Sequence, residues 1–436
     1  MNARVFIGLS DICGYYTQLE RGLNEIGVSC SFVNAYPDRD YGRVSTPGRV
    51  GRFVEWVARR RVRVARGTLA RRFWSAVEAG GLILLLANAL VTFDVFIFSG
   101  GITFLFRRDL RLLKLFRKRI IVVFHGSDSR PPYLNAASVG TEGRFDVQSC
   151  VRETREIKRK LRAIERYADV IVNHSMSSHL HERQVVNWLQ VGIPYEVGTS
   201  AATRTAVSER AVVIVHAPTR PGPKGTALIE RAITSLQQKG HAIRFVKLID
   251  QPHANVLEAL SECDFVVDEL FSDTTMASFA AEAAAFGKPA IVGMQGFNEL
   301  RRYTSSDVIP PALVCRADEV ESAIERLVVD QEYRVELGRQ ARQFLEEQWK
   351  PSRVAARFVR MASGDIPSEW WFDPNTLDYL LGWGLTDTRA REVIRVIVDE
   401  HGSSALEVTD KPALQRALVA FGTSGAARAD AVATTR

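Results

Sequence analysis

Short apolar runs alternate with amphipathic stretches along the first half of the chain. Five runs rich in branched and aromatic residues predict β-strands, at residues 4–9, 30–33, 94–98, 120–124 and 169–173. Between them, apolar residues recur every three or four positions, which predicts helices at residues 17–26, 74–90, 104–116 and 153–167. Strands that alternate with helices in this way indicate a parallel sheet with helices on both faces.

The second half of the chain repeats this alternation. Its apolar runs predict strands at residues 211–215, 243–249, 264–268, 289–292 and 312–315, with helices at 227–238, 317–329, 334–348 and 351–361. The polar stretch 198–208 lacks apolar periodicity, so we expect it to link the halves. We therefore predict an α/β protein with two Rossmann-like, doubly wound domains, residues 1–200 and 201–362. Ligands of such sheets bind at the carboxyl ends of the strands, so two facing sheets would share one cleft.

Residues 363–436 do not continue the alternation. Aromatic and leucine residues gather between residues 370 and 383, and helical patterns follow at 388–400 and 411–421. A helical module of roughly fifty residues is too small to be secure alone, so we expect it to dock on the rest of the protein. The small and polar residues 426–436 are expected to be disordered.

The composition, with 46% hydrophobic and 25% charged residues, is typical of soluble globular proteins. The five cysteines are scattered and lack metal-ligand spacing, which is typical of a reducing compartment. No signal peptide is recognisable, so we expect a cytoplasmic protein. The apolar stretch 81–106 is interrupted by Asn88, Asp94 and two glycines. It therefore predicts a buried helix (residues 74–90), a strand and a turn rather than a membrane span.

A predicted strand, a turn rich in glycine and proline, and a predicted helix meet around residues 216–226, HAPTRPGPKGT. The start of a helix offers unpaired N–H groups and the positive end of the helix dipole, which suits a phosphate group. Gly225 lets a ligand approach the backbone closely, Thr226 follows it, and Lys224 adds a point charge with Arg220 as its partner. These four residues are candidates for phosphate binding, and a solvated turn is the alternative.

A second motif, EAAAFGKPAIV at residues 282–292, reads as a helix closed by Gly287 and followed by a strand. We expect Glu282 in the first turn of this helix, where a carboxylate is favoured. The two motifs, in this order and spacing, resemble the donor-binding half of retaining nucleotide-sugar glycosyltransferases with the GT-B fold, in particular the group 1, family-four-like transferases. The resemblance extends over residues 1–362, strongly at 211–292 and weakly elsewhere.

The resemblance implies that the second domain binds a nucleotide-sugar donor. Lys224 and Arg220 would stabilise the nucleotide diphosphate leaving group, because a fixed cation there favours the transition state over the ground state. Glu282 would accept hydrogen bonds from the ribose hydroxyls. Since these cations and the helix start balance the charge of the leaving group, no cofactor and no catalytic metal is expected. Residues 38–40 (DRD) imitate the metal-binding acidic pair of another transferase fold, and we interpret them as solvated.

The chain departs from the family pattern at two places. The family's arginine lies five residues before the lysine, whereas Arg220 lies four before it. The family's second glutamate, eight residues before Glu282, is Thr274 here. Asp273, Thr274 or the backbone of residues 274–278 would then hold the transferred sugar. This departure also leaves open a degraded active site.

Polar residues follow predicted strands in the N-terminal domain as well. His125, Ser127 and Asp128 come after the fourth strand and resemble the segment in which the family places a histidine near the donor sugar. In a retaining enzyme His125 would hydrogen-bond the sugar, whereas in an inverting enzyme His125 or Asp128 would take the acceptor's proton. A turn capped by Asp128 is the alternative. Gly14, after the first strand, and His174, after the fifth, would also line the cleft as contacts for donor or acceptor.

The net charge of +7 is concentrated in two stretches. Residues 49–72 contain nine arginines and residues 107–119 contain seven basic residues, both with apolar residues at helical spacing. Basic amphipathic helices suit the surface of an anionic membrane. Since they lie in the acceptor-side domain, we hypothesise a lipid-linked acceptor and a peripheral position on the inner face of a membrane. A solvated basic face is the alternative, and no nucleic-acid motif accompanies the charge, so no nucleic-acid partner is expected.

The leading hypothesis is a cytoplasmic glycosyltransferase that moves a hexose-type sugar from a nucleotide diphosphate to a growing glycan or lipid-linked acceptor, with retention implied by the resemblance. One alternative is a nucleotide-sugar 2-epimerase on the same two-domain frame. A second is a non-catalytic scaffold protein in glycan assembly, which Thr274 and the added aromatic module favour. The sequence carries no signal for an oligomeric state.

Overall fold

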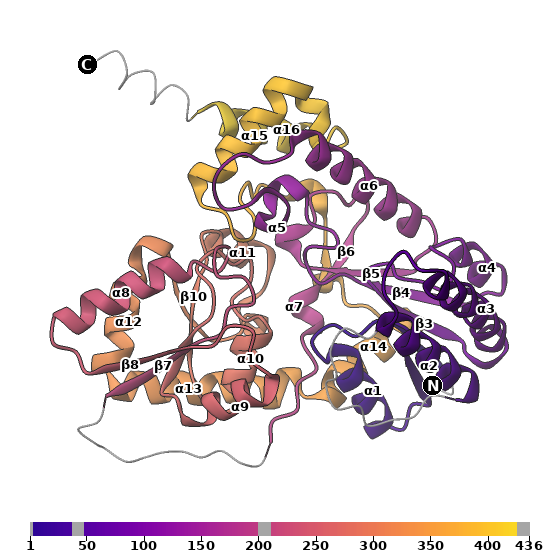
Figure 1. Ribbon diagram of the computed structural model, residues 1–436, viewed down its shortest axis with the longest axis horizontal. Helices are drawn as coiled ribbons and strands as arrows, with labels where there is room; N and C mark the ends of the chain where they lie inside the picture. Colours follow the sequence, from indigo (N-terminus) through magenta and orange to yellow (C-terminus); the bar gives the residue numbers. More distant parts are fainter. Residues whose placement is uncertain (1–2, 37–47, 199–210, 425–436) are drawn as a thin grey trace.

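A computed structural model of the chain describes residues 3–36, 48–198 and 211–424. It has two α/β lobes side by side, with the N-terminal lobe on the right and the C-terminal lobe on the left in Figure 1, and the last helices above them. Almost all of the expected linker 198–208, the whole of residues 38–40 and the C-terminal stretch 426–436 lie outside the described residues.

The N-terminal lobe is built on a seven-stranded sheet with the order β12-β6-β5-β4-β3-β1-β2. All neighbouring strands are parallel except β12, which pairs antiparallel with β6. The strands of this lobe are β1 (Val5–Leu9), β2 (Cys30–Asn34), β3 (Val95–Ser99), β4 (Arg119–Val123), β5 (Val170–Asn173) and β6 (Val185–Asn187). The five expected strands are confirmed. β1 and β3 are buried along their whole length, as expected for central strands of a parallel sheet covered on both faces.

The helices of the N-terminal lobe cover both faces of this sheet. They are α1 (Tyr15–Glu25), α2 (Arg49–Arg63), α3 (Leu69–Thr92), α4 (Asp109–Leu115), α5 (Ala136–Val139), α6 (Val147–Glu165) and α7 (Trp188–Val191), with 3₁₀ turns η1 (Pro132–Leu134) and η2 (Ser175–Ser177). One of them, α3, is long and apolar enough to cross a membrane, yet only 33% of its apolar window is buried. The expectation of a buried helix at residues 74–90 is therefore wrong for one face of α3, where Ile83 and Leu84 are exposed.

The C-terminal lobe has a five-stranded parallel sheet with the order β11-β10-β9-β7-β8. Its strands are β7 (Val212–His216), β8 (Ile243–Lys247), β9 (Phe265–Val267), β10 (Ala290–Gly293) and β11 (Leu313–Cys315). Its helices are α8 (Thr226–Gln238), α9 (His253–Glu262), α10 (Ser278–Ala285), α11 (Phe297–Tyr303), α12 (Val320–Val329) and α13 (Gln331–Phe344). Because α10 begins at Ser278, Glu282 lies in its second turn. The prediction that Glu282 lies in the first turn, near the positive end of the dipole, is wrong.

Helix α14 (Pro351–Ser363) returns from the C-terminal lobe and packs against α1, beside which it lies in Figure 1. Gly22 of α1 permits this approach, because a Cβ atom there would overlap the backbone of Pro351. The chain then forms β12 (Trp371–Phe372) at the edge of the first sheet, followed by α15 (Asp387–His401) and α16 (Pro412–Thr423). The C-terminal module therefore docks on the N-terminal lobe and shares its sheet.

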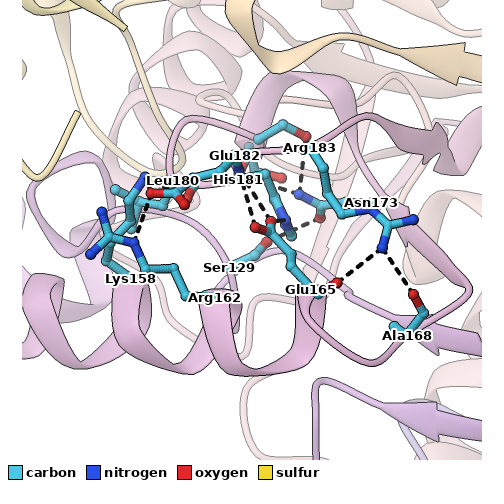
Figure 2. Close-up of polar contacts among 12 residues, drawn as sticks. Ser129, Lys158, Arg162, Glu165, Ala168, Asn173, Leu180, His181, Glu182 and Arg183 are labelled. Atoms are coloured by element: carbon cyan, nitrogen blue, oxygen red, sulfur yellow. Dashed lines mark hydrogen bonds and ion pairs between the residues drawn. The ribbon is translucent and has the colours of Figure 1, made fainter. Parts of the chain in front are cut away.

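A buried polar network fixes part of this docking. Lys158 of α6 is buried, and its ammonium group donates to Leu180 O at 3.1 Å and to Asp410 Oδ1 of the module at 2.9 Å. Glu182 accepts from Lys158 at 3.0 Å and from Arg162 at 2.7 Å, and Figure 2 shows these side chains gathered along α6. Because Glu182 and Asp410 pair with Lys158, the buried ammonium group is not left as an unpaired charge.

Candidate functional site

A cavity of about 230 Å³ lies between the lobes, at the carboxyl ends of β1, β4, β5 and β6. The loop that precedes α10 closes it from the C-terminal lobe. Its lining residues are Ile12, Cys13, Tyr15, Phe124, His125, Gly126, Arg130, His174, Trp188, Ile193, Asp273, Thr274, Ala277 and Ser278. The position agrees with the expectation that ligands bind where strand ends of the two sheets face each other.

His125 reaches the cavity from the turn after β4. Its Nε2 atom lies 2.9 Å from Tyr16 Oη, and its backbone N–H donates to Asp128 Oδ1 at 3.0 Å. Burial lowers the pKa of His125, and the nearby Asp128 carboxylate only partly opposes this. The imidazole is therefore neutral at pH 7 and suited to exchange a hydrogen bond with an uncharged ligand group. Asp128 caps the turn, and Ser127 is exposed to solvent outside the cavity.

An ion pair between Arg130 and Asp273 joins the two lobes at the cavity wall. Both side chains are buried. Burial alone would raise the pKa of Asp273, but Arg130 holds it below its ordinary value. The carboxylate is thus ionised and already paired, so it is a fixed part of the wall rather than a free base.

His174 lies beside this pair, immediately after β5. Its Nδ1 atom accepts a hydrogen bond from the backbone N–H of Met176 at 3.3 Å. Burial lowers the pKa of His174 to about 4, so the ring is neutral and its single proton is on Nε2. This Nε2–H group is buried and has no hydrogen-bond partner among the described residues.

Three further side chains of the cavity wall carry buried polar atoms without a partner among the described residues. They are Arg130 through Nε, Trp188 through Nε1 and Thr274 through Oγ1. Each such atom costs about 1–3 kcal/mol when it stays unpaired. Two of these atoms can only donate a hydrogen bond, as does His174 Nε2, and all of them are closed off from solvent.

Lys224, the leading candidate for phosphate binding, does not line this cavity. It is buried, and its Nζ atom donates to Asp268 Oδ1 at 2.7 Å and lies 3.7 Å from Glu269 Oε2. Burial alone would lower the pKa of Lys224, but these two carboxylates raise it above its ordinary value. Lys224 is therefore charged, and its charge is balanced within the C-terminal lobe. Arg220, by contrast, is exposed, with no acid at ion-pair distance in the described part of the chain.

His216 holds the start of α8. It belongs to the motif at residues 216–226 but is not among the predicted site residues. His216 Nδ1 donates to Val267 O at 2.8 Å, so its Nε2 accepts from the Thr226 hydroxyl at 2.8 Å. Gly225 has a φ of +75° and lies against Leu270, where a Cβ atom would approach to 2.9 Å. These contacts fix the turn in a conformation that favours glycine.

Glu282 also lies outside the cavity, and its Oε1 atom is 2.9 Å from His253 Nε2. Gly14, with a φ of +77°, shapes the loop whose neighbours Cys13 and Tyr15 line the wall. The structure thus brings His125, His174, Asp273 and Thr274 together, and leaves the other candidates around the cavity or on the C-terminal lobe. The roles of all of these residues stay predictions.

Sequence reasoning missed Arg130, Trp188 and Tyr15 as wall residues. Arg130 lies in the same turn as His125 and could have been included on that ground. Trp188 follows β6, a strand of three residues that is too short to give a periodic signal.

The arrangement of the two lobes is similar to that of solved structures. The apo structure of OtsA aligns over 84% of this chain and 100% of its own, with 11% identity and a TM-score of 0.51. An α-glucosyltransferase in complex with UDP and a 13-mer DNA aligns over 83% of this chain and 100% of its own, with 13% identity and a TM-score of 0.49. Alr3699/HepE of Anabaena in complex with UDP and glucose aligns over the same shares, with 11% identity and a TM-score of 0.45.

The likeness to OtsA shows that this chain has the GT-B fold, with two doubly wound domains facing a cleft. The predicted fold class is therefore confirmed. No protein-family model matches the sequence, and no curated protein matches it.

Proposed function

We propose that this protein transfers a sugar from a nucleotide diphosphate to an acceptor, and that the reacting sugar occupies the cavity between the lobes. The observation that carries this proposal is the cavity itself, which polar side chains of both lobes line: His125, Arg130 and His174 from the first lobe, and Asp273 and Thr274 from the second. A sugar ring carries several hydroxyl groups at short spacing, and these can exchange hydrogen bonds with side chains of these types.

The size of the cavity decides which part of a donor it would hold. A volume of about 230 Å³ is below the roughly 300–1,000 Å³ of typical small-molecule sites, so it suits one sugar ring and not a whole nucleotide-sugar. The nucleotide would then lie on the C-terminal lobe, along the start of α8 and near Glu282. There Glu282 would exchange its contact with His253 for the ribose hydroxyls.

We propose that the anomeric configuration is retained, because the carboxylate in the wall is ion-paired and is not placed to act as a base. The carboxylate in the cavity wall belongs to Asp273, and it forms an ion pair with Arg130. His125, neutral and hydrogen-bonded to Tyr16, is the group that would accept a proton in an inverting reaction. We assign to it a hydrogen bond with the sugar, and the anomeric configuration of the product, measured by NMR, tests this assignment.

The acceptor we propose is a glycan or a lipid-linked sugar at the cytoplasmic face of a membrane. The decisive experiment incubates the full-length protein with a panel of nucleotide-sugars and measures binding by calorimetry and release of nucleotide diphosphate. We expect one donor to bind. Thr274→Val should weaken this binding, whereas Ser127→Ala, in the exposed part of the turn after β4, should leave it unchanged. Failure of every nucleotide-sugar to bind would refute the proposal.

One observation favours a second candidate, a non-catalytic scaffold with the same fold. Lys224, which should grip the diphosphate, is neutralised by Asp268 and Glu269. A scaffold of this kind would bind no nucleotide diphosphate in the calorimetric experiment. A nucleotide-sugar epimerase, in contrast, would bind the donor and isomerise it without any acceptor, which chromatography of the sugar detects.

A further inference from the structure

One face of α3 is apolar along its whole length and exposed. Its large exposed side chains are Leu69, Phe73, Ile83, Leu84 and Val91, with exposed fractions of 81, 61, 53, 60 and 75%. At 3.6 residues per turn these positions fall on one stripe roughly 100° wide, together with the small residues Ala76, Gly80 and Ala87. No charged side chain interrupts the stripe. A continuous apolar face of this length on a soluble protein marks an interaction site.

The opposite face of α3 belongs to the core of the N-terminal lobe. Leu82, Leu85, Leu86 and Ala89 are buried, and Gly81 lies against Val54 and Phe53 of α2. A membrane-spanning position would remove these side chains from the core. The helix is therefore placed to lie along a surface with its exposed stripe, and not to cross a bilayer.

Further exposed apolar residues lie around α4. The chain connections from β2 to β3 and from β3 to β4 run in the same direction along the sheet, so right-handed crossovers place α3 and α4 on one face. Both helices lie at the outer edge of the N-terminal lobe in Figure 1. Phe106 before α4, and Leu115 and Phe116 at its end, are also exposed. We call the stripe of α3 and these three residues the apolar face.

The charges around the apolar face are almost all positive. Exposed arginines near it include Arg66, Arg72, Arg108, Arg111 and Arg117. Within residues 48–119 the acids are Glu55, Glu78, Asp94 and Asp109. Three of these acids are buried, and the fourth, Asp94, forms an ion pair with Arg4. The surface thus combines an apolar stripe with these surrounding arginines, which we call the cationic rim.

We propose that the apolar face docks in the plane of an anionic lipid surface. An anionic bilayer is the partner that satisfies both features, because its acyl region takes the apolar stripe and its headgroups pair with the arginines. A second copy of this chain would bring two cationic rims together, which opposes association. A nucleic acid would pair with the arginines but would leave the stripe uncovered. The proposal stands independently of the sugar-transfer reaction.

Vesicle flotation with the full-length protein tests this proposal. We expect binding to vesicles of phosphatidylcholine mixed with phosphatidylglycerol, little binding to phosphatidylcholine alone, and release by high salt. Replacement of two exposed stripe residues, in Ile83→Gln/Leu84→Gln, should weaken binding at least tenfold. Replacement of Arg72 and Arg111 by glutamine should weaken it about fivefold for each charge removed. The matched control is Val335→Gln on α13, which is equally exposed on the other lobe and should change nothing.

Three outcomes would overturn the proposal. The first is no binding to anionic vesicles. The second is binding that depends on the arginines but not on Ile83 and Leu84, which indicates a purely electrostatic partner such as a nucleic acid. The third is a concentration-dependent dimer in light scattering that Ile83→Gln/Leu84→Gln dissociates, which assigns the face to a second copy. Because the substituted side chains are exposed, unchanged circular dichroism and urea unfolding will show that the variants are folded.

Discussion

Replacement of Lys224 by methionine should destabilise the protein before it affects any reaction. Methionine keeps the length of the side chain but removes the charge that balances Asp268 and Glu269. The side chains of these three residues are 11, 1 and 6% exposed, so the group is a buried ion cluster and not a surface salt bridge. Asp268 Oδ2 already lacks a hydrogen-bond partner among the described residues, so nothing else compensates the carboxylate.

The expected loss follows from this burial. Removal of one partner of a buried ion pair costs about 3–5 kcal/mol, because an uncompensated charge stays behind. The total stability of a domain is only about 5–15 kcal/mol, so urea unfolding will resolve the effect easily. The matched control is Lys247→Met on β8. Lys247 pairs with Glu230 at the surface, and its loss should cost no more than about 1 kcal/mol.

The cause of the loss can be separated from a mere packing defect. If the unpaired carboxylate is responsible, Asp268→Asn should restore part of the stability in the Lys224→Met background, with a coupling of roughly 0.5–3 kcal/mol in the double-mutant cycle. A packing defect predicts additive losses. A loss below about 1 kcal/mol for Lys224→Met, or simple additivity, would refute the reasoning from burial.

The pH dependence gives an independent check on the same residues. Burial raises the pKa of Glu269, although Lys224 opposes this. A carboxyl group with a raised folded pKa contributes stability below its unfolded pKa, about 4.3, and loses that contribution as the pH rises through the folded pKa. Without Lys224, the pKa of Glu269 should rise further above its ordinary value. The free energy of unfolding that Lys224→Met loses, measured in urea, should therefore be larger at pH 7 than at about pH 5.

Three further results are expected. Thr274→Val should lower the affinity for the donor about threefold to tenfold, as measured by calorimetry. The free energy of unfolding should stay unchanged or rise, because the substitution removes an unpartnered hydroxyl group, and a loss of stability would contradict this. Burial holds the pKa of His174 and His216 at about 4, so the folded protein should lose stability as the pH falls from about 6.5 toward 4, by on the order of 3 kcal/mol for each ring; a pH-independent melting temperature over this range would refute it. Gly382→Ala should detach the C-terminal module, measured as faster proteolysis of its helices, because a Cβ atom there overlaps Leu134 O. The matched control is Gly80→Ala on α3, where the backbone is helical and a Cβ atom meets nothing within 4 Å.

The alternation of strands and helices was enough to predict the fold, because both sheets are parallel apart from β12 and their central strands are buried, largely apolar runs. Strands of two or three residues, such as β6 and β12, carry too little pattern to be recognised. Position along the chain could also place His125 and His174 at one edge of the sheet, since both follow central strands. Their exact partners come from other elements and have no local signal.

The errors have a common physical origin. The motif around Lys224 contains no acidic residue, and the carboxylates that neutralise Lys224 follow β9, more than forty residues later in the chain. Helix α3 is apolar on nearly all sides, which is typical of a buried helix, and only the packing of the lobe decides that one face stays outside. Glu282 lies in the second turn because α10 begins at Ser278, four residues before the motif that indicated the helix.

The C-terminal module has a larger part in the site than its late position suggests. Trp383 Nε1 donates to Glu269 Oε2 at 3.1 Å, while its backbone N–H donates to Leu134 O at 3.1 Å. Gly384 N donates to Phe271 O at 2.8 Å. One short segment thus ties the carboxylates around Lys224 to the N-terminal lobe, a few residues after Arg130. Since Arg130 also pairs with Asp273, two separate contacts set the distance between the lobes, and one of them lies in the cavity wall. The shape of the cavity in this chain therefore depends on residues that lie outside residues 1–362, the part that resembles known glycosyltransferases.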